Sequence, residues 1–511
     1  MKNSSRCKLA VLFVCVLLVS GCATVSFDQP KSYSQAITDP EETSLGEYAA
    51  LKVEEQEGLS GFYPLKEGLD ALGMRLRLAE TAEKSLDLQY FLIKNDDAGA
   101  VIAAALLKAA DRGVRVRFLL DDIFTTVPDD SFLLINQHPN IDIRIFNPIS
   151  RSGVSTFNFI RHFKQANRRM HNKSFTADNT ISVIGGRNIA DEYFELKTGS
   201  IFIDFDVLAI GPIVTEISHS FDEYWNHSRA VPIEQFIKAR QSHELENIRE
   251  EIAEELDEIY YTVYEKAFNR QLLIDFVEDR QQLFAAPARV LADSPDKLVN
   301  EINETHMRLA MDLREVIQQA EKEAIFISPY YVPGEGGVQL IHDLVEKGVR
   351  VVILTNSLAS TNHVPVHAAY ARYRRDVIQA GAELYEIRAN AARELNYSQD
   401  GPEHLTLHTK VFVIDQKKLF VGSLNLDPRS IRLNAEMGLL IDSEAMVAGL
   451  FNKDGEGLRT NTYRVLVNDK GDLEWHCIID NQKVIETKEP LTSRWLRFKA
   501  WFMKIAPESQ L

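Results

Sequence analysis

The chain has 511 residues, of which 45% are hydrophobic and 26% are charged, and its formal net charge is −17. This length exceeds what one hydrophobic core usually serves, so two or more domains are expected, and the composition excludes a disordered chain or a protein with many membrane spans. The negative charge argues against general binding to nucleic acid, so an anionic substrate would need a local basic pocket.

Residues 1–21 have the features of a secretory signal peptide. Lys2, Arg6 and Lys8 precede the apolar run 9–19, and small residues follow it. Eleven apolar residues are too few to span a bilayer comfortably, so a permanent membrane helix is the weaker interpretation. Removal of this segment takes away three basic charges and changes the net charge from −17 to −20.

Residues 19–22, with the sequence Val-Ser-Gly-Cys, resemble the lipobox of bacterial lipoproteins. The resemblance implies cleavage before Cys22 and a membrane anchor made of acyl chains on that residue, the alternative being a plain signal peptide with an incidental cysteine. By resemblance to lipoprotein sorting in bacteria with two membranes, Ala23 after the cysteine implies the outer membrane, with the protein facing the periplasm. Only Cys22 and Cys477 would remain after cleavage, so no internal disulfide is expected.

The first large segment after the signal alternates between helix and strand. Residues 22–61 are polar and rich in turn formers, which predicts a tether with little core. Within 62–232 the patterns predict a helix at 68–81, a strand at 85–93, a helix at 98–112 and a strand at 114–120. Short apolar strands between helices predict an α/β layer architecture.

The same order returns in residues 286–445, where the patterns predict a helix at 309–320, a strand at 324–328 and a helix at 338–346. Gly348-Val-Arg-Val-Val-Ile-Leu repeats Gly113-Val-Arg-Val-Arg-Phe-Leu 235 residues later, and Tyr330-Tyr331 follows Tyr90-Phe91 by 240 residues. The spacing predicts an internal duplication of a whole domain.

Two segments lie outside this duplication. Residues 233–285 are rich in glutamate with apolar residues at helical spacing, which predicts a solvated helical connector in preference to a lipid- or partner-binding element. Residues 446–511 contain a predicted hairpin and then an amphipathic segment with Trp495, Phe498, Trp501 and Phe502. Packing of that aromatic stripe onto the protein is preferred here to a position at a membrane interface.

A motif of the form H-x-K-x4-D occurs twice. The first copy is His171, Lys173 and Asp178, followed by Gly185 and Asn188; the second is His408, Lys410 and Asp415, followed by Gly422 and Asn425. Every member of the second copy lies 237 residues after its counterpart. One copy would be weak support, but two copies in register exclude coincidence.

The spacing of the motif suits chemistry on an anion. Residues two apart in a strand point to the same side, so each histidine projects together with its lysine. The small residues downstream let the next turn approach closely, and Asn188 or Asn425 can place its amide in the same space. Neither a metal nor another cofactor is expected, because lysine is not a usual ligand and no cluster of carboxylates or cysteines accompanies it.

Two histidines in one site can divide the work of phosphodiester chemistry. One imidazole can attack phosphorus to form a covalent intermediate, while the other protonates the leaving alcohol and later deprotonates the acceptor. The two lysines and the two asparagine amides would stabilise charge on the non-bridging oxygens.

Residues 69–442 resemble the phospholipase D superfamily through these motifs. The resemblance implies two tandem α/β/α sandwich domains related by a pseudo-two-fold axis, with mixed sheets flanked by helices and a metal-independent site that forms a phosphohistidine. It implies His171 as the nucleophile and His408 as the general acid, although the reverse assignment stays open by symmetry. Asp178 and Asp415 would be structural. A separate acid would orient each histidine: Glu436 fits one position, and Asp204, or else Asp206, fits the other.

Four further stretches are similar to bacterial cardiolipin synthases, within them a lipoprotein-like, third-type subfamily. They are Leu119-Leu-Asp-Asp122, Ser328-Pro-Tyr-Tyr-Val-Pro-Gly334, His367-Ala-Ala-Tyr370-Ala-Arg-Tyr373-Arg374 and Leu426-Asp-Pro-Arg-Ser430. Such synthases commonly begin with transmembrane helices, whereas this chain has a signal segment and an expected lipid anchor.

Transfer of a phosphatidyl group to make cardiolipin is therefore the leading hypothesis, with a phospholipid substrate and no nucleic-acid partner. The alternatives are hydrolysis of phospholipids to phosphatidic acid, a nuclease or other phosphodiesterase of the same superfamily, and a non-catalytic role; the oligomeric state is left open. Two basic groups, Arg161 to Arg169 and Arg372 with Arg374, are either the local basic pocket or solvated faces.

Overall fold

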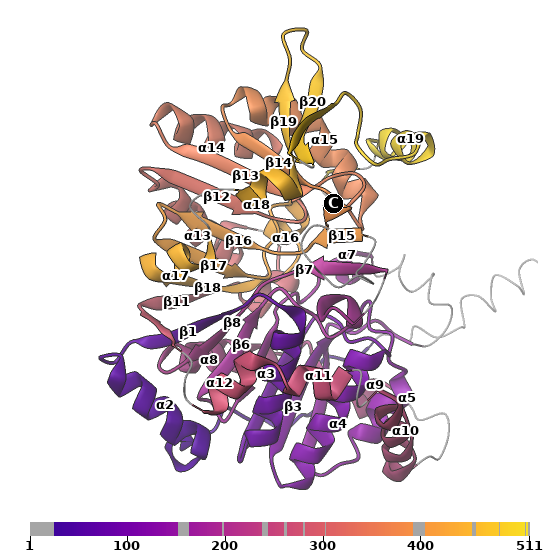
Figure 1. Ribbon diagram of the computed structural model, residues 1–511. Coiled ribbons are helices and arrows are strands. Elements are labelled where there is room, and N and C mark those ends of the chain that lie inside the picture. The colour runs from indigo at the N-terminus through magenta and orange to yellow at the C-terminus, as the bar shows by residue number, and fades with distance from the viewer. Residues whose placement is uncertain are drawn as a thin grey trace, which may run out of the picture.

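Two α/β halves are stacked on one another in the computed structural model, the first in indigo to magenta and the second in orange to yellow (Figure 1). The structure describes residues 25–151, 163–196, 199–237, 244–259, 263–278, 282–301, 303–391, 404–451, 456–479, 481–505 and 507–508. Cys22 and the signal segment lie outside these ranges. In the described part of the chain no helix combines the length and the apolar character needed to cross a membrane.

The first half is built on a nine-stranded mixed sheet in which β2, β3 and β4 run parallel. In spatial order its strands are β10 (Phe284–Ala286), β1 (Ser60–Leu65), β8 (Asp206–Ile210), β6 (Ile181–Gly185), β5 (Ser174–Ala177), β2 (Ser85–Tyr90), β3 (Arg115–Asp121), β4 (Ile141–Phe146) and β9 (Ala230–Pro232).

The second half repeats this arrangement in a ten-stranded sheet. Its order is β11 (Ala288–Ala292), β18 (Met437–Asp442), β17 (Lys418–Gly422), β16 (Val411–Ile414), β12 (Glu323–Ile327), β13 (Arg350–Asn356), β14 (Glu383–Ile387), β19 (Thr462–Val467), β20 (Leu473–Ile479) and β21 (Gln482–Glu486). The spatial run β11-β18-β17-β16-β12-β13-β14-β19 matches the run β1-β8-β6-β5-β2-β3-β4-β9 of the first sheet, strand for strand. Its strands β12, β13 and β14 are again parallel. The predicted fold class, two tandem α/β domains with mixed sheets, is confirmed.

Helices flank both sheets where the sequence patterns place them. The predicted helix at 68–81 is α3 (Gly68–Thr81), and the others expected in the two halves are α4 (Asp97–Asp111), α13 (Arg308–Gln318) and α14 (Gly334–Glu346). Further helices of the two halves are α5 (Asp129–Ile135), α7 (Phe163–Ala166), η2 (Asp191–Tyr193), α8 (Ile213–Asn226), α9 (Ile233–Phe236), η4 (Pro295–Leu298), η5 (Glu304–His306), α15 (Val364–Gln379), α16 (Pro428–Arg432), α17 (Glu444–Leu450) and α18 (Glu456–Asn461).

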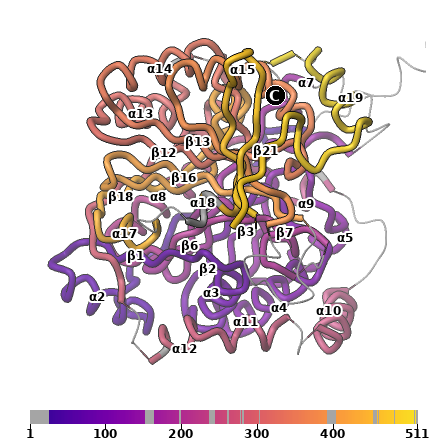
Figure 2. The backbone as a smooth tube through the Cα atoms, turned by 45° about the horizontal axis from the view of Figure 1, so that its top comes forward, coloured from indigo at the N-terminus to yellow at the C-terminus, as the bar shows by residue number. Residues whose placement is uncertain are grey.

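The connector and the segment expected to be a tether both pack on the first half. The connector forms α10 (Leu245–Ile259), α11 (Glu265–Phe268) and α12 (Gln271–Val277), which lie along α3 and α4, with Ile248 and Ile252 in the core (Figure 2). The segment expected to have little core contains η1 (Pro40–Glu42) and α2 (Ser44–Glu55), whose Leu45 and Ala49 are buried. The difference arises because α2 is amphipathic and the surrounding polar sequence hides its short apolar stripe.

Short strands and a shared core join the halves. β7 (Ser200–Ile203) of the first half pairs in parallel with β15 (His404–Leu407) of the second, and an isolated bridge joins Met170 to Ala435. Residues of β8 and β6, such as Val207 and Ile184, share a hydrophobic cluster with β16 and β17. The halves therefore meet along backbone pairing and apolar contacts, which fixes their relative position at the motifs.

The C-terminal helix α19 (Arg494–Met503) lies against α15, at the edge of the second half. Its aromatic stripe points to solvent: Trp495, Phe498, Trp501 and Phe502 are 71%, 51%, 64% and 54% exposed. The preferred prediction, that this stripe packs onto the protein, is wrong. The face that does pack carries small or aliphatic residues, with Ala500 buried and Leu496 partly buried.

Candidate active site

Both motifs lie at equivalent edges of the two sheets. Lys173 directly precedes β5 and Lys410 directly precedes β16, two antiparallel strands next to the parallel strands β2 and β12. The start of β5 is therefore level with the carboxyl end of β2, where Gln89 pairs with Ser174. The carboxyl ends of the parallel strands are the common place for sites in α/β sheets, and both histidines lie there.

Each motif histidine is held by a carboxylate from the other half. His171 Nδ1 lies 2.8 Å from Glu436 Oε2, and His408 Nδ1 lies 2.5 Å from Asp204 Oδ2. Asp206, the alternative to Asp204, instead lies 2.8 Å from the guanidinium of Arg75. The two His–carboxylate pairs thus cross the interface in both directions.

The backbone sets these pairs. The amide of His171 donates to the carbonyl of Ala435, and the amide of His408 donates to that of Ile203, at 2.8 and 2.7 Å. Because each acceptor is the residue just before a carboxylate, backbone pairing brings Glu436 and Asp204 to the imidazoles. The bridge between Met170 and Ala435 is thus the short counterpart of the pairing between β7 and β15.

The two motif lysines are buried and turn back towards their own histidines. Lys173 Nζ donates to the carbonyl of His171 at 2.5 Å and lies 5.4 Å from the centre of the Phe91 ring. Lys410 Nζ lies 2.8 Å from His408 Nδ1 and 3.3 Å from Nε2. Both ammonium groups therefore stand where they can meet negative charge on a group bound at the imidazoles.

The motif aspartates lie at the other ends of β5 and β16, away from the histidines, and bind backbone amides. Asp178 accepts hydrogen bonds from the amides of Glu83, Lys84 and Ser85 at 2.8–2.9 Å. Asp415 accepts them in the same way from Glu321, Lys322 and Glu323. Each aspartate fixes the loop before a central parallel strand, an arrangement in accord with the structural role that the resemblance implies.

The downstream asparagines and glycines are packed beside the histidines. Asn188 Nδ2 donates to the Tyr193 hydroxyl at 2.9 Å, and Asn425 Nδ2 lies 3.4 Å from Ser430 Oγ, so one N–H of each amide is left for another acceptor. A Cβ on Gly186 would lie 2.2 Å from Asp204 Oδ1. The second glycine of the Gly-Gly pair thus makes room for the carboxylate that holds His408.

Several contacts at the site have no signal in the motifs. The ring of Phe91 contacts His171 edge-on at 4.9 Å, while Phe202 stacks on His408 at 5.3 Å. Tyr193 also contacts His408 edge-on at 5.0 Å, and Ser423 Oγ donates to Glu436 Oε2 at 2.5 Å. The sequence marks Tyr90-Phe91 only as part of the repeat. Pairing between distant segments places these side chains, and local sequence does not reveal it.

Burial dominates the electrostatics of the site. Desolvation, with Lys410 alongside, lowers the pKa of His408 to about 4 against the opposing effect of Asp204. It lowers the pKa of His171 as well, and it lowers those of Lys173 and Lys410 to about 7 and about 8. Burial alone would raise the pKa of Asp204, but Lys410 and His408 lower it to about 2. Each lysine also lowers the pKa of the other half's histidine, so the two motifs form one electrostatic unit.

The other basic groups proposed from sequence do not line this site. Arg169 is buried and donates to Asp121, Asn147 and Gln165. Arg374 forms buried ion pairs with two glutamates, and Arg372 pairs with Glu508. Arg161 lies outside the described residues. Arg169 and Arg374 are therefore neither a free basic pocket nor a solvated face, whereas Arg372 is an exposed residue in an ion pair. Among the described residues, the positive charge at the histidines comes from Lys173 and Lys410.

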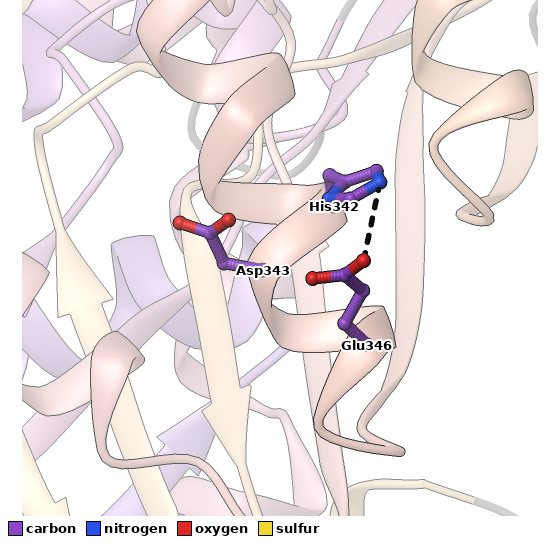
Figure 3. A group of neighbouring side chains, drawn as sticks. All are labelled: His342, Asp343 and Glu346. Atoms are coloured by element: carbon purple, nitrogen blue, oxygen red, sulfur yellow. Dashed lines mark ion pairs between the residues drawn. The ribbon is translucent and has the colours of Figure 1, made fainter.

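One group of potential metal ligands occurs in the described part of the chain, on the outer helix α14. His342, Asp343 and Glu346 bring ligand atoms within 4.8 Å of one another, and all three are exposed (Figure 3). His342 Nε2 lies 3.7 Å from Glu346 Oε1, as expected for neighbours one helical turn apart. We interpret the group as a solvated ion pair that shares no residue with the motif site.

Comparison with known proteins agrees with this architecture. The profile of the family described as "Cardiolipin synthase, PLD-like domain" matches residues 76–225 and 313–454. The chain is 36% identical over 453 residues to cardiolipin synthase C of Escherichia coli K12, a match that covers 88% of this chain and 96% of that protein. It is 27% identical over 396 residues to cardiolipin synthase A of Pseudomonas syringae, covering 75% and 67%.

A solved structure shows the same fold. Phosphatidylserine synthase of Haemophilus influenzae aligns with a TM-score of 0.53 at 14% identity, over 81% of this chain and 91% of that one. With the duplicated motifs, the two matching sheets and the family profile on both halves, this chain belongs to the phospholipase D-like family of cardiolipin synthases.

Proposed function

We propose that this protein is a phosphatidyltransferase that makes cardiolipin from phospholipids through a phosphohistidine intermediate. The observation that carries the proposal is the pair of buried histidines, each held by a carboxylate of the other half beside a buried lysine. The similarity along 88% of the chain to a protein named cardiolipin synthase C supports a phospholipid substrate. The acidic chain does not favour nucleic acid.

In the first step His171 is the nucleophile. An imidazole that donates its Nδ1–H to Glu436 presents the lone pair of Nε2 to phosphorus. The new N–P bond forms as the P–O bond to the headgroup alcohol breaks, and His408 gives the leaving oxygen its proton. Lys173 and Lys410 stabilise the negative charge that develops on the non-bridging oxygens.

In the second step the roles reverse. The hydroxyl of an acceptor phosphatidylglycerol gives its proton to His408 as its oxygen attacks phosphorus, and the N–P bond to His171 breaks. Cardiolipin leaves, and both histidines return to their starting protonation states. If water takes the place of the acceptor, the same intermediate yields phosphatidic acid, so the choice of acceptor decides between synthesis and hydrolysis.

Substrate binding and protonation of His408 are coupled in this scheme. With a pKa of about 4, His408 is mostly neutral near pH 7 before substrate arrives. An anionic phosphodiester beside the imidazole favours the charged form and raises its pKa, so substrate brings the general acid towards its working state. Asp204 favours the same imidazolium through its contact with Nδ1.

We also propose that lipid on Cys22 tethers the protein to the periplasmic face of the outer membrane. The support is the lipobox-like sequence 19–22 followed by Ala23. Labelled palmitate is expected to enter the wild-type chain and not the Cys22→Ser variant. Recovery of the wild-type protein in the inner-membrane fraction would contradict the proposed membrane.

The test of the activity is mass spectrometry of lipid products. The purified chain is incubated with phosphatidylglycerol, with and without phosphatidylethanolamine, beside a His408→Ala variant and a His219→Ala control. His219 is an exposed histidine on α8, so its loss is expected to leave the activity intact. Cardiolipin from wild type and control, and none from His408→Ala, is the expected result.

Two other outcomes would contradict the proposed transferase. Phosphatidic acid as the sole product, lost in His408→Ala, would make the protein a hydrolase with the same site. A complete absence of lipid products from every mixture would point to another phosphodiester substrate.

A further inference from the structure

The proposed reaction makes no use of the exposed aromatic face of α19. Trp495, Phe498 and Trp501 form a continuous ladder of rings, with centroid separations of 5.5 Å and 5.9 Å. Phe502 and Ile505 extend the same exposed face. Residues at these spacings lie on one side of a helix, so the rings form one stripe.

The body of the protein holds this helix with the stripe outward. Ala500 is buried and Leu496 and Met503 are partly buried, on the side of α19 opposite to the rings. Beyond the helix, Glu508 accepts hydrogen bonds from the hydroxyl of Tyr373 on α15 at 2.8 and 2.9 Å. The helix begins with a cap, in which Ser493 Oγ accepts from the amide of Leu496. The aromatic face is thus presented by a fixed element.

The charge of α19 is opposite to that of the chain. Residues 494–504 contain Arg494, Arg497, Lys499 and Lys504 and no acidic residue, whereas the whole chain carries a net charge of −17. Tryptophan and phenylalanine beside arginine and lysine on one helix is the composition of segments that lie in the interface of a membrane.

We propose that α19 binds in the plane of a bilayer that carries anionic headgroups, with its aromatic rings at the level of the acyl boundary. The partner is inferred from the rings and the charge together: the continuous aromatic ladder suits the acyl boundary of a bilayer, and the positive charge that surrounds it matches anionic headgroups. Both views show α19 at the outer edge of the second half (Figures 1 and 2).

The helix would add a second membrane contact to any lipid on Cys22. One anchor leaves a protein free to swing on its tether, whereas two separated contacts fix its orientation against the bilayer. None of the residues of this contact belongs to the motif site, so vesicle binding can be tested apart from the chemical step.

Tryptophan fluorescence of the full chain can test the contact directly. The four tryptophans are Trp225 and Trp475, both buried, and Trp495 and Trp501, both exposed on α19. With vesicles of phosphatidylcholine and phosphatidylglycerol, the emission is expected to shift to shorter wavelength, and brominated acyl chains are expected to quench it. The double variant Trp495→Ser with Trp501→Ser should lose both effects, while Ile485→Ser, at an exposed apolar residue of β21, should keep them.

A second variant tests whether vesicle binding depends on the positive charge of α19. Arg494→Gln with Lys499→Gln is expected to weaken the vesicle titration by about fivefold for each charge removed. An unchanged emission spectrum on addition of anionic vesicles would overturn the proposal. A blue shift that depends on protein concentration without vesicles would assign the face to a second copy, and would overturn it too. Unchanged thermal unfolding of each variant would show that these surface changes leave the fold intact.

Discussion

At the scale of single residues, burial determines how the motif side chains behave. Exposed histidines and lysines titrate near 6.5 and 10.4. In this site desolvation lowers the pKa of His408 to about 4 and those of Lys173 and Lys410 to about 7 and about 8. The lysines therefore lose their charge close to neutral pH, and the pH dependence of activity should reveal it.

The lowered pKa values of the two lysines predict that activity is lost as the pH becomes alkaline. A lysine is charged below its pKa, so with values of about 7 and 8 the site loses positive charge as the pH rises through this range. The value of kcat/KM, which reports groups of the free enzyme, is expected to fall from about pH 7 upward. Initial rates with phosphatidylglycerol across this range would measure it. A rate that stays level to about pH 9 would contradict the lowered lysine values.

The variant Lys173→Arg serves as the control for this titration. Arginine stays charged throughout, although its shape is not that of lysine and a lower rate is expected. The activity that remains in the variant should stay constant up to a higher pH than the activity of the wild type does. An alkaline limb at the same position in both proteins would assign the titration to another group.

Residue spacing alone identifies many of the residues of the candidate active site. Two motifs 237 residues apart point to the histidines and lysines that the structure brings together, and the spacing favours Asp204 over Asp206 as the acid next to a histidine. It does not reveal that Glu436 contacts His171, 265 residues away, and not His408 of its own half. Such pairing depends on the arrangement of the halves, which leaves no pattern in local sequence.

At the scale of elements, the motif aspartates anchor two equivalent hairpins. Asp178 follows β5 and Asp415 follows β16, and both adopt a left-handed backbone, with φ of 47° and 55°. Each binds three amides of the loop before a central parallel strand. The two positions differ in burial: Asp178 is fully buried and Asp415 is partly exposed.

This difference predicts unequal losses of stability. Asp178→Ala is expected to lower the free energy of unfolding by about 2–5 kcal/mol, because its carboxylate is fully buried and its loss leaves the buried amide of Ser85 without an acceptor. Asp415→Ala should cost about 1–2 kcal/mol, since the amides of Glu321 and Lys322 are exposed and can bind water instead. The strain of alanine at positive φ is common to both variants and cancels. Urea unfolding would measure the losses, and equal values would contradict the argument from burial.

Elements with long periodic patterns were predicted well, and the short strands that join the two halves were not. The helix at 68–81 has the predicted ends, since fourteen residues carry a clear apolar periodicity. β7 and β15 have four residues each and pair only with one another across the halves, so neither has a local signal. The outward aromatic face of α19 was missed because periodicity shows that a helix has an apolar face and not what covers it.

At the scale of the whole molecule, the duplication creates a site that neither half contains alone. The first half provides His171 and Asp204, and the second provides His408 and Glu436, so each half has a histidine and the carboxylate for its partner's histidine. The matching strand orders of the two sheets make this exchange symmetrical. A protein with two independent sites and a protein with one shared site therefore respond differently to the loss of one carboxylate.

The isosteric variants Glu436→Gln and Asp204→Asn distinguish these two cases. If each half worked alone, either variant would leave about half of the activity, because the other site would continue to turn over. In a shared site each variant disturbs one of two histidines that every turnover needs, so each is expected to lower kcat by about 10²–10⁴-fold. Initial rates of cardiolipin formation, with thermal unfolding to confirm that both variants fold, would measure the loss. Activity near half of the wild-type value in either variant would contradict a shared site, because that is the loss expected when one of two independent sites stops working.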